Sequence, residues 1–238
     1  MSAKTVRRLR YLLRVHLGQY PLLALPAFHL HPRQRSYVVS RRTEVVIEGY
    51  PRSANTFAVA AFSMAQPRVV RIAHHLHIPA QILRAAALGI PVIVLIRDPV
   101  EAAASLLVRE PHITASLALK SYIAFYSRVY DVRDHYVTAT FREVTTDFGS
   151  VIERLNAKFG TTFSPFKHTP HAVEAVMKIV EAMDREDRRA ADVDEKTVAR
   201  PSHVRAALKS VMRQRILGEP RLVRRAQEIY THFLTATQ

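Results

Sequence analysis

The chain contains no cysteine, and none of its apolar stretches is long. Without cysteine there is no disulfide, no thiolate metal ligand and no cysteine nucleophile. The apolar stretch at residues 22–30 is interrupted by Pro26 and is far too short to span a bilayer. The first residues lack the longer apolar centre and the small-residue cleavage site of a signal peptide. These absences favour a cytoplasmic protein whose contact with a membrane, if it makes one, is peripheral.

Acidic residues are missing from the first 43 positions, although the chain as a whole carries a formal charge of +15. A second basic run extends from Arg200 to Arg225, with Glu219 as its only acid. This balance indicates a polyanionic partner, which is a nucleotide, an acidic glycan, a nucleic acid or an anionic membrane. Residues 1–20 also place apolar side chains near helical spacing, which predicts a helix packed on the domain, with a membrane-surface helix as the alternative. The basic residues before the first acid, Glu44, are Lys4, Arg7, Arg8, Arg10, Arg14, Arg33, Arg35, Arg41 and Arg42.

The length of 238 residues, with 48% hydrophobic and 23% charged side chains, is typical of one ordered globular domain. Strand-like and helix-like segments alternate through about residue 110, as in parallel βαβ units, so we expect an α/β fold. Such units gather their loops at the carboxyl ends of the strands. Strands are expected at 45–47, 68–73, 92–96 and 136–142, and helices at 55–65, 79–88, 113–133, 148–159, 171–190, 201–217 and 219–235.

The stretch at 43–65 reads TEVVIEGYPRSANTFAVAAFSMA, a buried strand, a short loop and an Ala-rich helix. A loop of this kind suits an anion, because the first N–H groups of a helix have no partner within it. We therefore predict a phosphate or sulfate site, with a loop that merely caps the helix as the alternative. The residues that add side-chain donors are Arg52, Ser53, Asn55 and Thr56.

This loop differs from the nucleoside-triphosphate motif G-x-x-x-x-G-K-[ST], in which Gly and Lys occupy the positions of Ala54 and Asn55. Only Gly49 and Thr56 fit that template. The lysine that reaches the outer phosphates is missing, which argues against a kinase-like phosphoryl transferase.

A second strand-like run, at 92–96, is followed by Arg97-Asp98-Pro99 and by a helix that carries Ser105. Together the two stretches resemble the P-loop sulfotransferases. That family carries P-[KR]-S-G-T-T-W after its first strand, which residues 51–57 match as PRSANTF. It later carries R-[ND]-P-x-[DE]-x-x-x-S, which residues 97–105 match as RDPVEAAAS with the spacing preserved.

The resemblance implies a three-layer α/β/α sandwich with a central, mainly parallel sheet and a phosphate-binding loop. It implies transfer of a sulfuryl group from 3′-phosphoadenosine 5′-phosphosulfate (PAPS) to a hydroxyl or amine, with 3′,5′-adenosine bisphosphate (PAP) as the product. The acceptor would be a small molecule, a glycan or a lipid. No metal is required if fixed cations stabilise the charge of this in-line displacement. The nucleotide-binding core would span 43–165, between a basic segment at 1–42 and a helical part at 166–238.

The resemblance also assigns roles to single residues. Arg52 takes the position of the catalytic Lys or Arg, where it would stabilise the oxygen that leaves sulfur. Arg97 and Ser105 would hold the 3′-phosphate, whereas helix capping and a structural salt bridge are the alternative for this motif. The residues predicted to bind the donor are Pro51, Arg52, Ser53, Ala54, Asn55, Thr56, Phe57, Arg97, Ser105 and Arg205.

The general base is predicted from spacing, since one branch of the family carries a histidine twenty-two residues before the motif arginine. Counting back from Arg97 gives His75, whose imidazole could accept the proton of the acceptor. His74 and His77 are substitutes. Three clustered histidines also suggest a metal site, but no carboxylate or cysteine lies nearby in sequence, so we predict none.

The chain departs from the family at several positions. Ala54 replaces Gly and Asn55 replaces Thr, and a methyl group at position 54 should be tolerated only with a negative φ. The C-terminal R-K-G-x-x-G-D-W-K element of the cytosolic branch is absent, and the chain has no tryptophan. Cations that could replace this lid are Arg200, Arg205 and Lys209, for which a solvated helix face is the alternative.

Two further functions remain open from the sequence. The chain could be a basic polyanion- or nucleic-acid-binding protein whose loop is only structural, with binding that weakens steeply with salt. It could also be an inactive relative of the sulfotransferases that acts as an adaptor.

Overall fold

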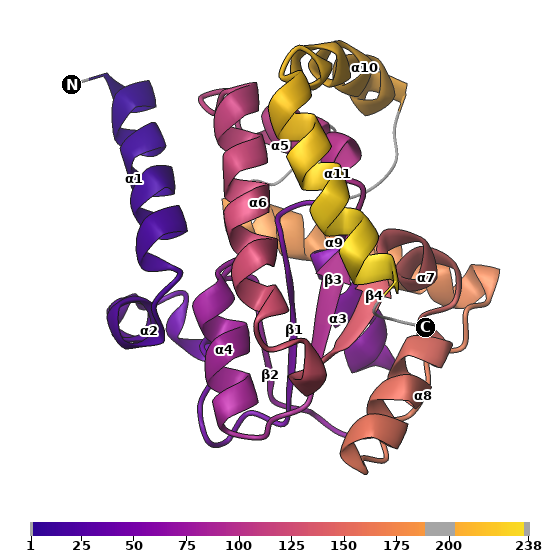
Figure 1. Ribbon diagram of the computed structural model, residues 1–238. Coiled ribbons are helices and arrows are strands. Elements are labelled where there is room, and N and C mark those ends of the chain that lie inside the picture. The colour runs from indigo at the N-terminus through magenta and orange to yellow at the C-terminus, as the bar shows by residue number, and fades with distance from the viewer. Residues whose placement is uncertain (1, 189–202, 236–238) are drawn as a thin grey trace.

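The computed structural model describes residues 2–188 and 203–235, and within them a sheet of four parallel strands in the order β2-β1-β3-β4 is flanked by helices (Figure 1). The strands are β1 (Val45–Gly49), β2 (Ile72–His74), β3 (Val92–Ile96) and β4 (Val137–Thr140). The α-helices are α1 (Ala3–Leu17), α2 (Pro21–Leu30), α3 (Asn55–Ala65), α4 (Pro79–Ala87), α5 (Pro99–Arg109), α6 (Ala115–Tyr130), α7 (Phe141–Thr146), α8 (Phe148–Phe159), α9 (Pro170–Arg188), α10 (His203–Leu217) and α11 (Pro220–Thr235). Short 3₁₀ turns lie at Arg35–Tyr37 and Arg133–His135.

The two central strands are buried on both faces, which explains their continuous β-branched and aliphatic sequences. Because successive side chains of a strand point to opposite faces, β3 contributes to two separate cores. Val92, Val94 and Ile96 pack with residues of α4, α5, α6 and α11. Ile93 and Leu95 pack with residues of α3, α8 and α9. The helices therefore cover both faces of the sheet.

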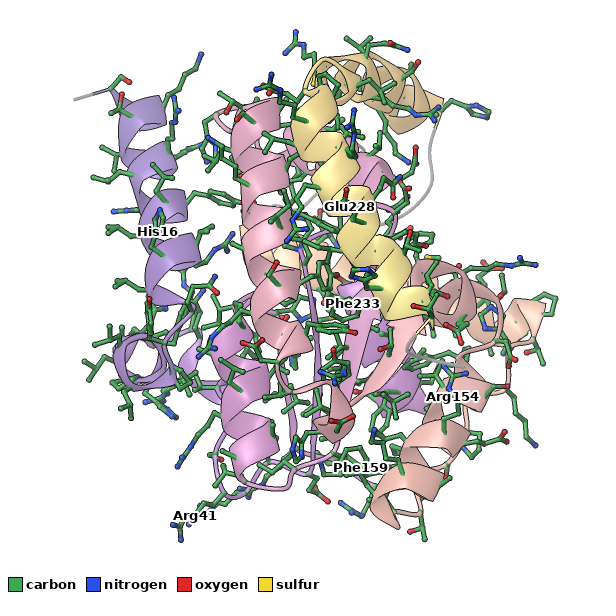
Figure 2. All side chains as sticks on the ribbon, in the orientation of Figure 1. His16, Arg41, Arg154, Phe159, Glu228 and Phe233 are labelled. Carbon is green, nitrogen blue, oxygen red and sulfur yellow. The ribbon has the colours of Figure 1, made fainter. Side chains whose placement is uncertain are left out.

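An aromatic cluster closes the first of these cores beneath α11. Phe233 lies between α11 and the sheet (Figure 2), with its ring centroid 5.2 Å from that of Tyr126 and 6.2 Å from that of Tyr136. Aromatic pairs at such distances add to the stabilisation that burial of their area provides. The predicted amphipathic helix at 113–133, which carries Tyr126, is therefore a core helix, as its aromatic residues indicate.

Most expected elements are present, and two strands differ for identifiable reasons. The strand expected at 68–73 begins only at Ile72, because Ile72 pairs with Val45, the first residue of β1. Residues before Ile72 therefore have no strand residue of β1 to pair with. The strand expected at 136–142 ends at Thr140, because Thr140 begins a helix instead. Its hydroxyl accepts the Glu143 N–H while the Glu143 carboxylate accepts the Thr140 N–H, and this capping box starts α7.

The N-terminal helices lie at the edge of the molecule, where α1 stands beside α6 on the side away from β4 (Figure 1). Tyr11 anchors α1, because its buried hydroxyl lies 2.7 Å from the Ser121 hydroxyl of α6. The expected helix at 1–20 is thus confirmed as one that packs on the domain. In the part of the chain that the structure describes, no helix is both long and apolar enough to cross a membrane.

Candidate functional site

The loop after β1 turns sharply into α3. A Cβ on Gly49 would lie 2.4 Å from the Leu95 carbonyl oxygen, so the end of β1 requires glycine. Arg52 and Ala54 have φ values of 72° and 70°, in the left-handed region that L-residues seldom adopt. The expectation that a methyl group at position 54 is tolerated only with a negative φ is therefore wrong: the turn imposes a left-handed conformation on an alanine, at a cost of about 1–2 kcal/mol.

The first turn of α3 presents its backbone N–H groups to the end of this loop. Within the described residues, the amides of Ala54, Asn55, Thr56 and Phe57 donate to no protein acceptor. The Asn55 side chain does not cap them, because its Nδ2 donates to the Tyr50 carbonyl, 3.0 Å away. A helix N-terminus with unoccupied amides and no acid in its first turn favours an anion.

The second motif lies at the adjacent strand end, after β3. Arg97 stacks its guanidinium over Phe141 at 3.9 Å from the ring centroid and donates from Nη1 to the Arg52 carbonyl, 3.0 Å away. Asp98 caps α5 by accepting the Glu101 N–H, as the capping alternative expects. The cap explains Asp98, and Nη2 of Arg97 lies 3.8 Å from the Glu101 carboxylate, as the salt-bridge alternative expects, while Nη1 points to the loop after β1.

Direct contact joins the two motifs. The Nε of Arg52 donates to the buried Ser105 hydroxyl at 3.1 Å, although the two residues are 53 positions apart. Both border a cavity of about 1250 Å³. The predicted site residues that line this cavity are Pro51, Arg52, Ala54, Asn55, Thr56, Phe57, His75, Arg97 and Ser105. Ser53 is not among them, because it is fully buried beneath the loop, 3.5 Å from the Tyr126 hydroxyl.

The histidine segment after β2 reaches the same cavity. Nε2 of His75 lies 3.2 Å from the Thr56 hydroxyl, and its Nδ1 contacts Nδ1 of His74. Both ring nitrogens of His75 are thus engaged. His77 differs, because its Nδ1–H donates to the Gly49 carbonyl at 2.8 Å, which leaves Nε2 as the nitrogen with a lone pair. His77 also lines the cavity.

Burial shapes the protonation of the first two histidines. It lowers the pKa of His74 to about 4, and the charge of His77 adds to this effect against an opposing contribution from Glu48. Burial, followed by the charges of His74, His77 and Arg109, holds the pKa of His75 well below 6.5. Both imidazoles are therefore neutral near pH 7 and act as hydrogen-bonding groups.

Glu48 supports this segment from below and was not expected from the sequence. Its side chain is fully buried in β1, where Oε2 accepts from the Leu76 N–H and from Nε2 of Gln81, each at 3.0 Å. Oε1 accepts the Gly49 N–H at 3.2 Å and lies 3.3 Å from Nδ1 of His77. The one signal in the sequence is an acid within a run of buried strand residues.

Backbone strain is concentrated around the cavity. Among the described residues, the non-glycine residues with positive φ are Arg52, Ala54, His75 and His77. Such conformations cost of order 1–3 kcal/mol each and cluster at functional sites, where surrounding contacts maintain them. Here the contacts are those of Glu48, Ser105 and the Gly49 carbonyl.

Comparison with known proteins adds nothing to these observations. No protein-family model, curated protein or solved structure matches this chain. The geometry of the cavity is therefore the basis of any functional conclusion.

The predicted cationic lid is only partly described. Arg200 and the side chain of Arg205 lie outside the described residues. Lys209 borders the cavity but donates to the Glu101 carboxylate. Burial raises the pKa of Glu101, but the hydrogen bond from Lys209 and the charges of Lys209, Arg97 and Arg213 outweigh it and bring that pKa below its usual value. In the described ranges, no group of three or more His, Asp or Glu side chains is arranged so that it could hold a metal ion.

Proposed function

We propose that this protein transfers a sulfuryl group from PAPS to an acceptor hydroxyl or amine, on a P-loop sulfotransferase fold with three α/β/α layers. The observation that carries the proposal is the contact of Arg52 with Ser105 beside the open amides of α3. It unites the two motifs of the resemblance at one edge of the sheet. Donors for two separate anionic groups then face one cavity, as a nucleotide with phosphates at both ends requires.

The 5′-phosphosulfate would bind at the amides of residues 54–57, with the Thr56 hydroxyl as a further donor. These amides are fixed before the ligand arrives, so they need no reorganisation as charge develops. Arg52 belongs to the same loop and remains charged at any pH of interest. Its role is to stabilise the oxygen that bridges sulfur and phosphorus as the S–O bond breaks.

The 3′-phosphate would bind between Arg97 and Ser105. Arg97 is held in place by the Phe141 ring and by the Arg52 carbonyl, which restricts its orientation before binding. The Ser105 hydroxyl accepts from Arg52, which fixes its oxygen beside the loop after β1. An Arg–phosphate pair of this kind is charge-assisted and strong.

The acceptor proton needs a base on the same side of the cavity. In the balanced step, the acceptor O–H gives its proton to an imidazole, its oxygen bonds to sulfur, and the electron pair of the breaking S–O bond remains on PAP. His75 stays the residue predicted from spacing. Both ring nitrogens of His75 are already engaged and its pKa is low, so His75 is a weak candidate for the base. We favour His77 instead, because the Gly49 carbonyl and Glu48 orient its ring and leave a lone pair on Nε2.

The first experiment measures the thermal shift that PAP and AMP produce in the wild-type protein and in the Arg97→Gln variant. A ligand at one hundred times its Kd adds about 2.7 kcal/mol of stability, or about 5–10 °C in a protein of this size. PAP should stabilise the wild-type protein more than AMP does, because only PAP has a 3′-phosphate. In the variant that difference should disappear.

The matched control is Arg154→Gln on α8 (Figure 2), because Arg154 also donates to a backbone carbonyl and pairs with a glutamate, but borders no part of the cavity. It should keep the full PAP shift. ATP and heparin serve as competing ligands. A shift led by ATP would indicate a phosphoryl transferase, and one led by heparin and lost in salt would indicate a polyanion-binding protein; either result refutes the proposal. Sulfuryl transfer from radiolabelled PAPS is then sought with alcohol, phenol, glycan and lipid acceptors.

A further inference from the structure

The face of α1 opposite Tyr11 carries leucines that remain about half exposed. Leu9, Leu13 and Leu17 follow one another at intervals of four residues, which places them in one stripe along the helix. Each is between 44% and 49% exposed. The opposite face holds the buried Tyr11, so these leucines are not needed to attach α1 to the domain.

The apolar surface continues into the next helix. Tyr20 is 56% exposed, and on α2 Leu22 and Leu23 are 88% and 58% exposed, while Leu30 at its end is 84% exposed. Exposed leucines are common singly, but this many exposed apolar side chains between residues 9 and 30 indicate an interaction surface. We call the exposed apolar residues of α1 and α2 the leucine face; they are Leu9, Leu13, Leu17, Tyr20, Leu22, Leu23 and Leu30.

Basic side chains flank the leucine face. Arg10 lies three residues before Leu13 and borders the leucine stripe, whereas Arg7 lies one turn before Tyr11; both are exposed. Neither forms an ion pair within the described part of the chain. Figure 2 shows side chains of α1, among them the labelled His16, extending into open space around the helix. No acid occurs before Glu44, so nothing in this segment offsets the positive charge.

We propose that the leucine face docks on the surface of an anionic lipid bilayer. A helix with an apolar stripe bordered by arginines inserts its apolar side chains at the level of the lipid headgroups and leaves the cations beside the phosphates. A second copy of this chain fits less well, because pairing two such faces would bring two uncompensated cationic segments together. An acidic bilayer complements the face in both charge and apolar character.

Docking would also orient the cavity. Arg14 belongs to α1, and His31 and Arg33 follow α2, and all three line the cavity. A bilayer under the leucine face would therefore lie next to this side of the cavity rim. This inference is independent of what the cavity binds, and the PAP measurements on the protein in solution do not bear on it.

The test is co-sedimentation with vesicles of phosphatidylcholine alone and of phosphatidylcholine mixed with phosphatidylserine. The wild-type protein should sediment with the mixed vesicles and remain in solution with the neutral ones. Replacing Leu9, Leu13 and Leu17 with Gln should lower the partition coefficient by more than about tenfold, because apolar area is no longer removed from water. Arg7→Gln with Arg10→Gln should lower it by about thirty-fold.

Matched controls alter other faces by the same chemistry. Gln at Val69, Val204 and Val211 removes exposed apolar side chains elsewhere, and Arg221→Gln with Arg224→Gln removes two exposed charges from α11. Both should bind like the wild-type protein, and unchanged melting temperatures confirm that every variant is folded. Equal binding by the leucine variant and the wild type overturns the proposal, as does a failure of the wild type to bind mixed vesicles. A dimer in sedimentation velocity that the leucine variant dissolves also overturns it, since the face would then join two copies.

Discussion

Replacing Glu48 with Gln should destabilise the protein and disturb the histidine segment, because this buried carboxylate accepts from several donors at once. Its two oxygens receive the Gly49 N–H, the Leu76 N–H and Nε2 of Gln81, and one lies near Nδ1 of His77. Glutamine has nearly the same shape but only one acceptor oxygen. Its amide nitrogen must face donors on one side or the other.

The magnitude follows from those contacts. If the glutamine oxygen keeps the hydrogen bonds from Leu76 and Gln81, both change from charge-assisted to neutral bonds. Each change lowers the stability by about 1 kcal/mol. The Gly49 N–H then lies buried opposite another donor, at a cost of about 1–3 kcal/mol. Relief of the buried charge offsets part of this, so we expect a net loss of about 2–4 kcal/mol, or about 4–16 °C in melting temperature.

The assay is thermal and urea unfolding followed by circular dichroism. Glu44→Gln is the matched control, because this surface carboxylate also accepts a backbone N–H and a side-chain donor, from Arg71 and Arg68. Glu44→Gln should lower the free energy of unfolding by less than about 1 kcal/mol, because the Glu44–Arg68 pair lies near the surface in high dielectric. If Glu48→Gln is no more destabilising than Glu44→Gln, the carboxylate does not organise the loop as we describe.

Two further predictions concern the same loops. His75 and His77 both have positive φ, so asparagine, which tolerates this backbone conformation, is the suitable replacement. His77→Asn should lower kcat by about 100-fold or more with little change in PAP affinity. His75→Asn should lower kcat less, and the reverse order would restore His75 as the base. Because the pKa of His75 lies well below 6.5, a rate that depended on neutral His75 would not decrease as the pH is lowered through 6.5. Ala54→Gly should raise the melting temperature by about 1–4 °C, since it relieves a left-handed alanine, whereas Ala182→Gly on an exposed turn of α9 should lower it. Equal decreases would show that Ala54 is not strained.

Much of the secondary structure could be predicted from local sequence. The runs at 45–49 and 92–96 form strands because β-branched side chains suit a strand buried on both faces. The helix at 148–159 ends where Gly160 adopts a positive φ, the position that glycine favours after a helix. The joint position of the two motifs was also predictable, because parallel strands place their carboxyl ends at one edge of a sheet.

Other features depend on contacts between distant residues, and no local pattern contains them. The sequence identified Arg52 and Ser105 as candidates, but only the packing of α5 against the loop after β1 brings Nε to the hydroxyl. It likewise could not show that Phe141, at the start of α7, would lie beneath the guanidinium of Arg97. The periodicity of α1 predicted an amphipathic helix, yet Tyr11 faces the domain and the leucine stripe faces outward.

The physical reason for this division is the range of the interactions. Strand and helix propensity, capping and hydrophobic periodicity act within a few residues, so the sequence determines the elements and the end of the sheet where the motifs meet. The burial of Glu48 and the left-handed turn at Ala54 depend on how those elements pack. The tertiary structure alone therefore decided which side chains face the cavity, which support it from beneath, and which remain exposed on α1.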